Sequence, residues 1–152
     1  MTKPVFETRD QTARIVTALE RIGHYLNDLL KAQAMEHGLS TLQVRILIFI
    51  HFYKRQTQLS LLAGEFGLSK ATLSVALKSM EQKKLIYKKP VAGDRRGVLI
   101  ELTEWGRRIA HVAGFYPEPL KKIVAPMTAM EKATLLEVIE GIVHKLLPEE
   151  AG

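Results

Sequence analysis

The sequence contains no cysteine, and this absence excludes several kinds of chemistry. No disulfide can form, no zinc site can be built on thiolates, and no thiol can act as a redox sensor. Long apolar runs are missing as well, because the longest uninterrupted aliphatic and aromatic run, at 46–50, is far too short to span a bilayer. The first residues contain no apolar stretch typical of a signal peptide. We therefore expect a soluble, cytoplasmic protein with no membrane partner.

Motifs for catalysis and for metal binding are also lacking. The histidines show no metal-ligand spacing among themselves or with nearby acids, so we expect each of them to be structural or exposed. No phosphate-binding loop, nucleophile elbow or pair of catalytic carboxylates occurs. The sequence therefore predicts neither an enzyme nor a resident metal ion or cofactor.

Positive charge is plentiful and is concentrated in the middle of the chain. The formal net charge is +6, but residues 54–108 alone carry twelve Lys and Arg against five acidic residues, a net charge of +7. The rest of the chain is nearly balanced, at −1. A basic segment between balanced ends is typical of a surface that binds a polyanion, although a solvated basic face without a partner has the same composition.

Helical periodicity dominates both ends of the chain. Apolar residues recur at helical spacing from about residue 10 to residue 35, and Gly38 follows where it can end the helix. A further helix is expected from Glu104 to about Phe115, before two prolines break it. Thr128 with Glu131 forms a capping box that opens a last helix. The apolar stripe of that helix is too broad for a lone surface helix: Leu135, Leu136, Ile139, Ile142, Val143 and Leu146.

Between these ends, three helices are expected. Ser40 with Gln43 forms a capping box before a helix that runs to about Tyr53 and is apolar on nearly all sides, which indicates burial. A polar connector, 54–58, leads to two short helices at about 59–66 and 70–83. They are separated by a turn at 67–69.

The two short helices have the features of a helix-turn-helix. Ala63 supplies a small residue where the helices meet, Gly67 permits a positive φ in the turn, and Ser69 can cap the second helix. The side of that helix opposite its apolar stripe carries lysines, short hydroxyls and small apolar groups, which can approach base edges and phosphates. A plain helical hairpin with a solvated basic face is the alternative.

A β-hairpin is expected directly after the helix-turn-helix. Residues 85–89 and 98–102 have the pattern of strands, and they flank a polar loop at 91–97 that contains two glycines. A hairpin with a basic tip beside such a helix is a wing, whose arginines can enter the minor groove while its lysines contact phosphates.

These segments together resemble the MarR family of bacterial winged helix-turn-helix regulators. The resemblance covers about residues 38–110 and is most specific where Asp94-Arg95-Arg96-Gly97 runs into Leu102-Thr103-Glu104-Trp105-Gly106. The resemblance implies that Asp94 orients Arg96 toward the minor groove and that the terminal helices form a dimer. It also implies that a small molecule, often an anionic aromatic compound, weakens the binding of DNA.

One residue departs from the family pattern. The family usually has glycine just before the first wing strand, where this chain has Lys84. If that position requires a positive φ, lysine costs on the order of 1 kcal/mol there.

A ligand pocket is a weaker hypothesis. Arg45 and His51 lie on or near the buried second helix, where a polar side chain could face a cavity, and aromatic residues cluster near the junction with the last helices. The candidate lining residues are Arg45, His51, Trp105, Phe115 and Tyr116, although an ordinary core, surface or packing role is the commoner explanation for such residues.

The sequence therefore predicts a mainly α single domain, 1–152, in which a winged helix-turn-helix at 38–103 lies between dimerisation helices at 1–37 and 104–152. Its expected function is that of a homodimer that represses transcription by binding a pseudo-palindromic double-stranded operator and is released by a small-molecule effector. The candidate DNA-binding residues are Ser69, Lys70, Ala71, Thr72, Ser74, Val75, Lys78, Lys88, Lys89, Asp94, Arg95 and Arg96. A winged-helix protein-interaction module and a non-specific architectural DNA-binding protein are the alternatives.

Overall fold

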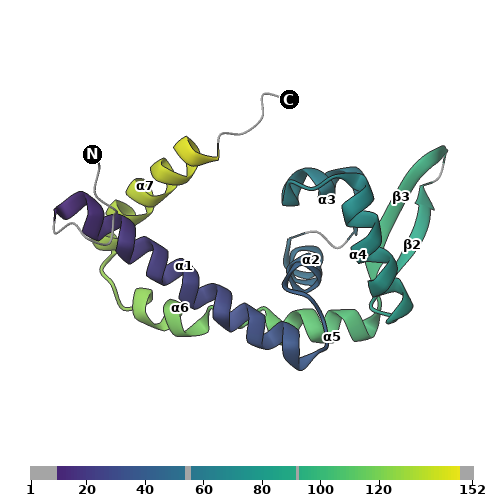
Figure 1. Cartoon of the computed structure of the whole chain (residues 1–152), viewed down its shortest axis with the longest axis horizontal. Helices are drawn as coiled ribbons and strands as arrows, with labels where there is room; N and C mark the ends of the chain where they lie inside the picture. Colours follow the sequence, from purple (N-terminus) through teal and green to yellow (C-terminus); the bar gives the residue numbers. More distant parts are fainter. Residues whose placement is uncertain (1–9, 54–55, 92, 148–152) are drawn as a thin grey trace, which may run out of the picture. The chain divides into compact units, whose positions relative to one another are not determined.

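A computed structural model describes residues 10–53, 56–91 and 93–147, which form seven helices and three strands (Figure 1). The mainly α fold with a small sheet agrees with the prediction from the sequence. By its internal contacts the chain divides into two compact units, the first ending at Tyr116 and the second beginning at Pro117. The elements are, in order, α1 (Gln11–Glu36), α2 (Thr41–Phe52), β1 (Gln56–Gln58), α3 (Leu59–Phe66), α4 (Lys70–Gln82), β2 (Ile86–Val91), β3 (Asp94–Leu102), α5 (Glu104–Ala113), α6 (Glu118–Val124) and α7 (Ala129–Leu146).

Polar caps start most of the helices, and the predicted caps are confirmed. Ser40 and Thr128 each form a complete capping box with the Gln or Glu three residues later. Ser69 accepts a hydrogen bond from the Thr72 amide at 3.1 Å, and Thr103 caps α5 in the same way. Each cap satisfies backbone amides that would otherwise have no partner at the start of a helix.

Three helices of the first unit are each followed by a residue in the left-handed backbone conformation. Gly38 after α1 and Gly67 after α3 have φ values of +66° and +62°. After α4 the corresponding residue is Lys84, at φ +60°. In the Schellman motif that results, the Leu85 amide donates to the Met80 carbonyl at 3.0 Å. Lys84, which stands where the family usually has glycine, therefore does have a positive φ.

The sheet is antiparallel, with strand order β1-β3-β2. The hairpin pairs Ile86 with Leu102 and Pro90 with Val98, and an irregularity follows between Pro90 and Val91. The strands are longer than predicted, since the loop expected at 91–97 is mostly strand. Backbone pairing across the hairpin continues beyond the apolar residues that marked the strands in the sequence.

The strand β1 was not predicted. Its three polar residues lie in the segment expected to be a connector, and they pair with β3, so that Thr57 faces Ile100. Because an edge strand this short needs no alternation of apolar and polar residues, its pairing leaves no local signal in the sequence.

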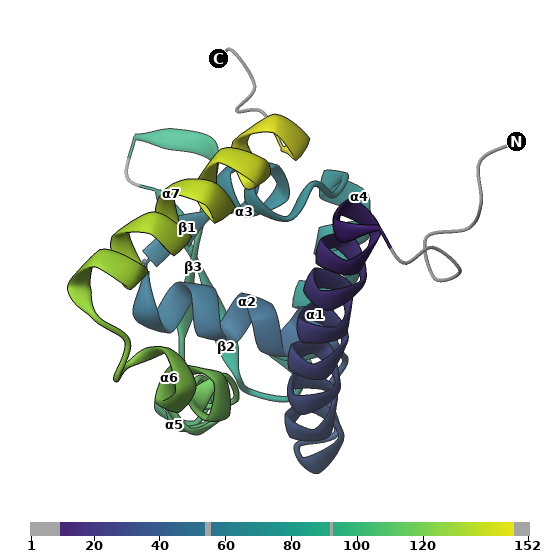
Figure 2. The ribbon, with the colours of Figure 1, turned by 90° about the vertical axis from the view of Figure 1, so that its left-hand side faces the viewer.

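The core of the first unit is built around α2, as its apolar content predicted. Val44, Ile46, Leu47 and Ile50 are all fully buried. They share one apolar cluster with residues of α3, α4, α5 and the sheet. Figure 1 shows the hairpin beside α4, with its tip projecting away from α2, and Figure 2 shows α2 crossing in front of the strands. Because α4 and the base of the hairpin pack on the same core, their positions relative to each other are fixed.

The second unit consists of α6 and α7. Pro117 is the N-cap of α6 and Pro119 lies in its first turn, so the prolines separate this unit from α5 as expected. Neither helix contains a buried residue. Much of α7 is apolar and exposed, including Leu136, Val138 and Val143. None of the helices described is long and apolar enough to cross a membrane.

Candidate nucleic-acid interface

The turn between α3 and α4 has the geometry that a helix-turn-helix requires. Gly67 takes the left-handed conformation, and the Leu68 amide donates to the Ala63 carbonyl at 2.9 Å. Ala63 is buried at 8% exposure, in agreement with its predicted place between the helices. A small buried residue and a left-handed glycine let two short helices approach and change direction within three residues.

Helix α4 has one buried side and one exposed side. Leu73, Leu77 and Met80 are fully buried against the core. Of the candidate DNA-binding residues on this helix, five are exposed and Ser74 is half-buried; the exposed residues are Lys70, Ala71, Thr72, Val75 and Lys78. Most of the α4 surface that was predicted to bind DNA is therefore exposed.

The hydroxyl groups at the start of α4 already have partners within the helix. Ser69 accepts from the Thr72 amide and donates to Thr72 Oγ1 at 2.9 Å. Ser69 is therefore first of all a cap, and its proton is used by Thr72. Thr72 still has its own hydroxyl proton to donate.

Gln43 is a residue whose second role the sequence did not indicate. Its Oε1 accepts from the Ser40 amide at 3.0 Å, as the capping box predicted. Its Nε2 also lies 3.4 Å from the Ala76 carbonyl, so the same amide joins the start of α2 to the middle of α4. A polar side chain that is 7% exposed needs such partners, and this pair helps to hold α4 in place.

In the wing, Lys88 and Lys89 are both exposed on β2. At the tip, the backbone of residues 94–96 belongs to β3, but the side chains of Asp94, Arg95 and Arg96 lie outside the part that the structure describes. The orienting contact between Asp94 and Arg96 stays a prediction.

A buried acid lies lower in the wing, where β2 and β3 pair. Tyr87 faces Glu101 across the hairpin, and its hydroxyl donates a hydrogen bond to Glu101 Oε2. This bond raises the pKa of Tyr87, and partial burial and the negative charge of Glu101 act in the same direction. The pair joins the two strands by their side chains, and no pattern in the sequence pointed to it.

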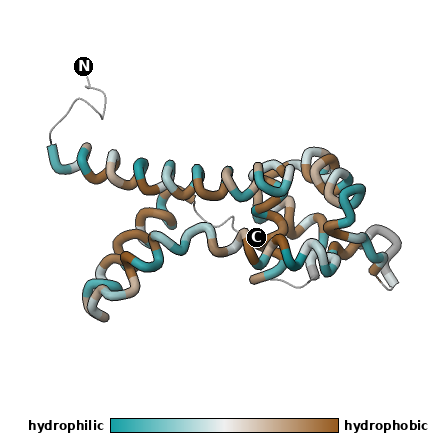
Figure 3. The backbone as a smooth tube through the Cα atoms, turned by 90° about the horizontal axis from the view of Figure 1, so that it is seen from below, coloured by the Kyte–Doolittle hydropathy of each residue, from teal (hydrophilic) through white to brown (hydrophobic). Residues whose placement is uncertain are grey.

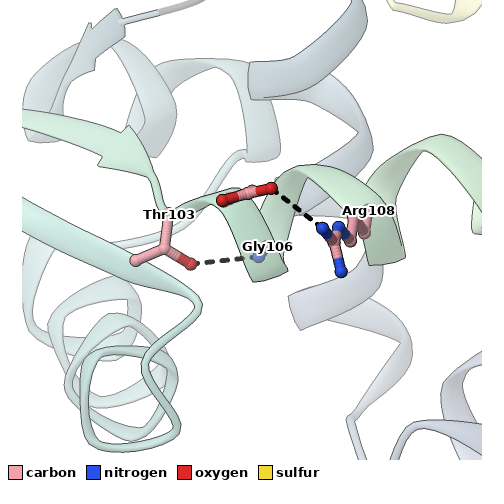
Figure 4. Close-up of polar contacts among 4 residues, drawn as sticks. Thr103, Gly106 and Arg108 are labelled. Atoms are coloured by element: carbon pink, nitrogen blue, oxygen red, sulfur yellow. Dashed lines mark hydrogen bonds and ion pairs between the residues drawn. The ribbon is translucent and has the colours of Figure 1, made fainter.

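The base of the wing is tied to α5 through Thr103, Gly106 and the backbone after α4. The Thr103 hydroxyl lies 2.7 Å from the Lys84 carbonyl and 3.1 Å from the Leu85 carbonyl. Figure 4 shows the same oxygen accepting from the Gly106 amide, at 3.0 Å. A Cβ on Gly106 would lie 2.1 Å from the Leu85 carbonyl oxygen, so only glycine allows this approach. The Thr and Gly of the segment 103–106 therefore anchor the hairpin.

The predicted ligand pocket is only partly assembled. His51 and Phe115 join a cluster on α2 and α5 with two residues that were not predicted, Phe52 and His111. The ring centroids of His51 and His111 are 5.6 Å apart, and those of His111 and Phe115 are 5.3 Å apart. Tyr116 packs against the core instead.

The remaining candidates, Arg45 and Trp105, are exposed. The signal that would have indicated His111 is the i, i+4 spacing of Arg107, His111 and Phe115 along α5.

The charges around this aromatic cluster are positive. The pKa of His51 is lowered, first by burial and then by the neighbouring charges of His111 and Arg107. Among the described residues, no three histidine or acidic side chains gather into a group that could hold a metal ion. Aromatic rings beside imidazoles and a guanidinium suit an anionic group better than a cation.

The arrangement of α3, α4 and the hairpin defines a winged helix-turn-helix protein. Residues 37–97 match the model of the MarR family, so the resemblance seen in the sequence is confirmed over this segment. No curated protein sequence matches the chain.

Solved structures of MarR-family regulators share this fold over most of their length. AbsC from Streptomyces coelicolor is 21% identical, with a TM-score of 0.72 over 92% of this chain and 97% of that one. A putative MarR family regulator from Listeria monocytogenes, complexed with 26mer DNA, is 19% identical, with a TM-score of 0.72 over 86% and 87%. NadR in complex with 4-hydroxyphenylacetate is 16% identical, with a TM-score of 0.64 over 93% and 96%. The chain therefore has the fold of a MarR-family transcriptional regulator.

Proposed function

We propose that this protein is a homodimeric transcriptional regulator that binds a pseudo-palindromic DNA operator and represses by occupying it. The observation that carries the proposal is the exposed side of α4, where Lys70, Thr72 and Lys78 face outward beside a wing that carries Lys88 and Lys89. Exposed lysines on two adjacent elements suit a helix in the major groove with a hairpin over the neighbouring phosphate backbone. The complex of the Listeria relative with DNA supports this use of the fold.

A second copy of the chain is the partner we propose for the terminal helices. In α7, Leu136 and Val143 are 56% and 48% exposed within one protomer. Apolar residues also recur along α1, the helix that begins beside the N label in Figure 3; Ile15 and Ile22 are among its exposed residues. Apolar helix faces of this extent are stable in water when they are covered, and dimerisation covers them.

A small anionic aromatic molecule is the effector that we propose. It would bind at the cluster of His51, Phe52, His111 and Phe115, with Arg107 nearby. The rings offer stacking surfaces, and an imidazole N–H or the Arg107 guanidinium offers hydrogen bonds to a carboxylate. That NadR was crystallised with 4-hydroxyphenylacetate, a molecule of this class, supports the proposal.

Selection from fragments of the native genome, followed by footprinting, tests the proposal. We expect protection of two half-sites about 10 bp apart, related by dyad symmetry, because a two-fold dimer places its recognition helices in successive major grooves. Mobility-shift assays on genomic and random duplexes at two salt concentrations separate the alternatives. An architectural protein would show steep salt dependence with little sequence preference, and a protein-interaction module would bind neither duplex.

A further inference from the structure

The exposed side of α4 is not uniformly basic. Ala71 and Val75 lie on it one helical turn apart, between Lys70 and Lys78. Val75 is 73% exposed, more than any other large apolar residue of α3 or α4. The middle of the surface that faces DNA in the proposed function is therefore hydrocarbon.

Few polar groups on this side can read bases near its middle. Residues 70–78 include no Asn, Gln, Arg, Asp or Glu, so the long side chains that can pair with base edges are limited to Lys70 and Lys78, at the two ends of this side. The Ser69 hydroxyl is used by Thr72, at 2.9 Å, and Ser74 is half-buried. Lys70 and Lys78 can reach a guanine or a phosphate at the two ends of this side, and Thr72 can donate one hydrogen bond, but none of these groups accounts for the exposed Val75.

The stability of the helix does not account for Val75. A β-branched residue loses rotamer freedom in a helix, and an exposed one gains nothing from packing to offset that loss. Alanine would be the better residue at this position for the isolated protein. Val75 is thus best explained by a contact made outside the chain.

We propose that Val75 contacts the 5-methyl group of a thymine in the major groove, and that Ala71 extends this apolar contact. This inference rests on the proposed function. Thymine is the base that presents a methyl group in that groove, and apolar side chains recognise it. The Cβ atoms of residues i and i+4 are about 6 Å apart, a little under two base-pair steps of about 3.4 Å. Each operator half-site therefore contains a thymine opposite Val75, and Ala71 reaches a base pair within two steps of it.

Replacing thymine with uracil tests this contact, because uracil lacks only the methyl group. The probe is a duplex recovered by the full-length protein from a random-sequence library, resynthesised with deoxyuridine at one thymine at a time. We expect one symmetry-related thymine position where the replacement weakens binding about three- to fivefold per half-site, the effect of one buried methyl group. In Val75→Ala the same replacement should change the affinity less than about 1.5-fold.

Val112→Ala is the matched control, since Val112 is an exposed valine, at 57%, on α5. It should keep the full difference between thymine and uracil probes. If the wild-type protein binds every uracil-substituted probe as tightly as the parent duplex, or if Val75→Ala keeps the full difference, the methyl contact is wrong while the proposed function stands. If selection recovers no preferred sequence, the proposed function itself fails.

Discussion

At Lys84 the backbone adopts a conformation that an L-residue with a Cβ seldom takes. The same motif closes α1 at Gly38, which has no such strain, so the two positions form a natural comparison within one chain. The strain at Lys84 is retained because the Leu85 amide and carbonyl are both engaged at the base of the wing, with Met80 and Thr103. The conformational strain at Lys84 is therefore imposed by the hydrogen bonds of the neighbouring Leu85.

Lys84→Gly should raise the free energy of unfolding by about 0.5–1 kcal/mol. The left-handed conformation costs a residue with a Cβ about 1–2 kcal/mol, and the greater freedom of glycine in the unfolded chain cancels part of the gain. Urea denaturation followed by circular dichroism measures the change. Gly38→Lys is the reverse control and should be destabilised by about 1 kcal/mol. A Lys84→Gly protein that is no more stable than the wild type would mean that the lysine side chain makes compensating contacts.

At the scale of elements, the wing and α4 should contribute to DNA binding in different ways. Arg96→Ala should cost on the order of 1–3 kcal/mol of operator affinity and should make the dependence on salt shallower. Asp94→Ala should reproduce part of this loss, because its proposed task is to orient Arg96. Lys70→Ala should instead change base preference and affect non-specific binding less, as predicted for the helix in the major groove. Fluorescence anisotropy on operator and random duplexes measures both effects.

Unchanged circular dichroism spectra and melting temperatures are the condition for comparing these variants. Removing a negative charge near phosphate would by itself strengthen binding. Tighter operator binding by Asp94→Ala would therefore contradict the orienting role.

The packing of α2 on α5 should weaken as the pH falls. Because burial and the charges of His111 and Arg107 lower the pKa of His51, the unfolded chain binds a proton more readily than the folded protein does. The stability is then fully present above the ordinary pKa of about 6.5 and is lost as the pH falls below it. Unfolding midpoints at pH 7.5 and 5.5 should differ more for the wild type than for His51→Gln.

His144→Gln is the control for this comparison, because His144 is an exposed histidine on α7. It should leave the dependence on pH as it is in the wild type. An equal loss of stability in His51→Gln and the wild type would show that other groups dominate.

At the scale of the whole molecule, removing residues 128–152 should abolish both the dimer and tight operator binding. The double variant Leu136→Lys, Val143→Lys should do the same without shortening the chain, since both side chains are exposed in the protomer. Sedimentation velocity measures the mass, and Glu140→Lys, an exposed polar position on the same helix, serves as the control. A double variant that stays dimeric with unchanged affinity would place the interface elsewhere.

Much of this molecule could be predicted because its signals are local. The caps at Ser40, Ser69 and Thr128 and the turn at Gly67 are each determined within four residues, and all are found in the structure. The features that were missed join residues far apart in the sequence. They include the pairing of β1 with β3, the Gln43 contact with Ala76, the Tyr87–Glu101 hydrogen bond and the His51–His111 contact. No periodicity marks such pairs, because only the folded chain brings them together.

Because Thr103 and Gly106 attach the wing to the start of α5, a rotation of α5 about this point would also rotate the wing. Strand β3 has nine residues, and at about 3.3 Å per residue its tip lies about 30 Å from that anchor. A rotation of α5 by about 5° would therefore move the tip by about 2.6 Å, close to the length of one hydrogen bond. His111 lies near the other end of α5, and Phe115 follows shortly after it; in the proposed function, an effector bound between these rings and α2 would tilt α5. A displacement of this size, too small to disturb the core, would then be enough to break hydrogen bonds between the wing and the DNA of the proposed complex.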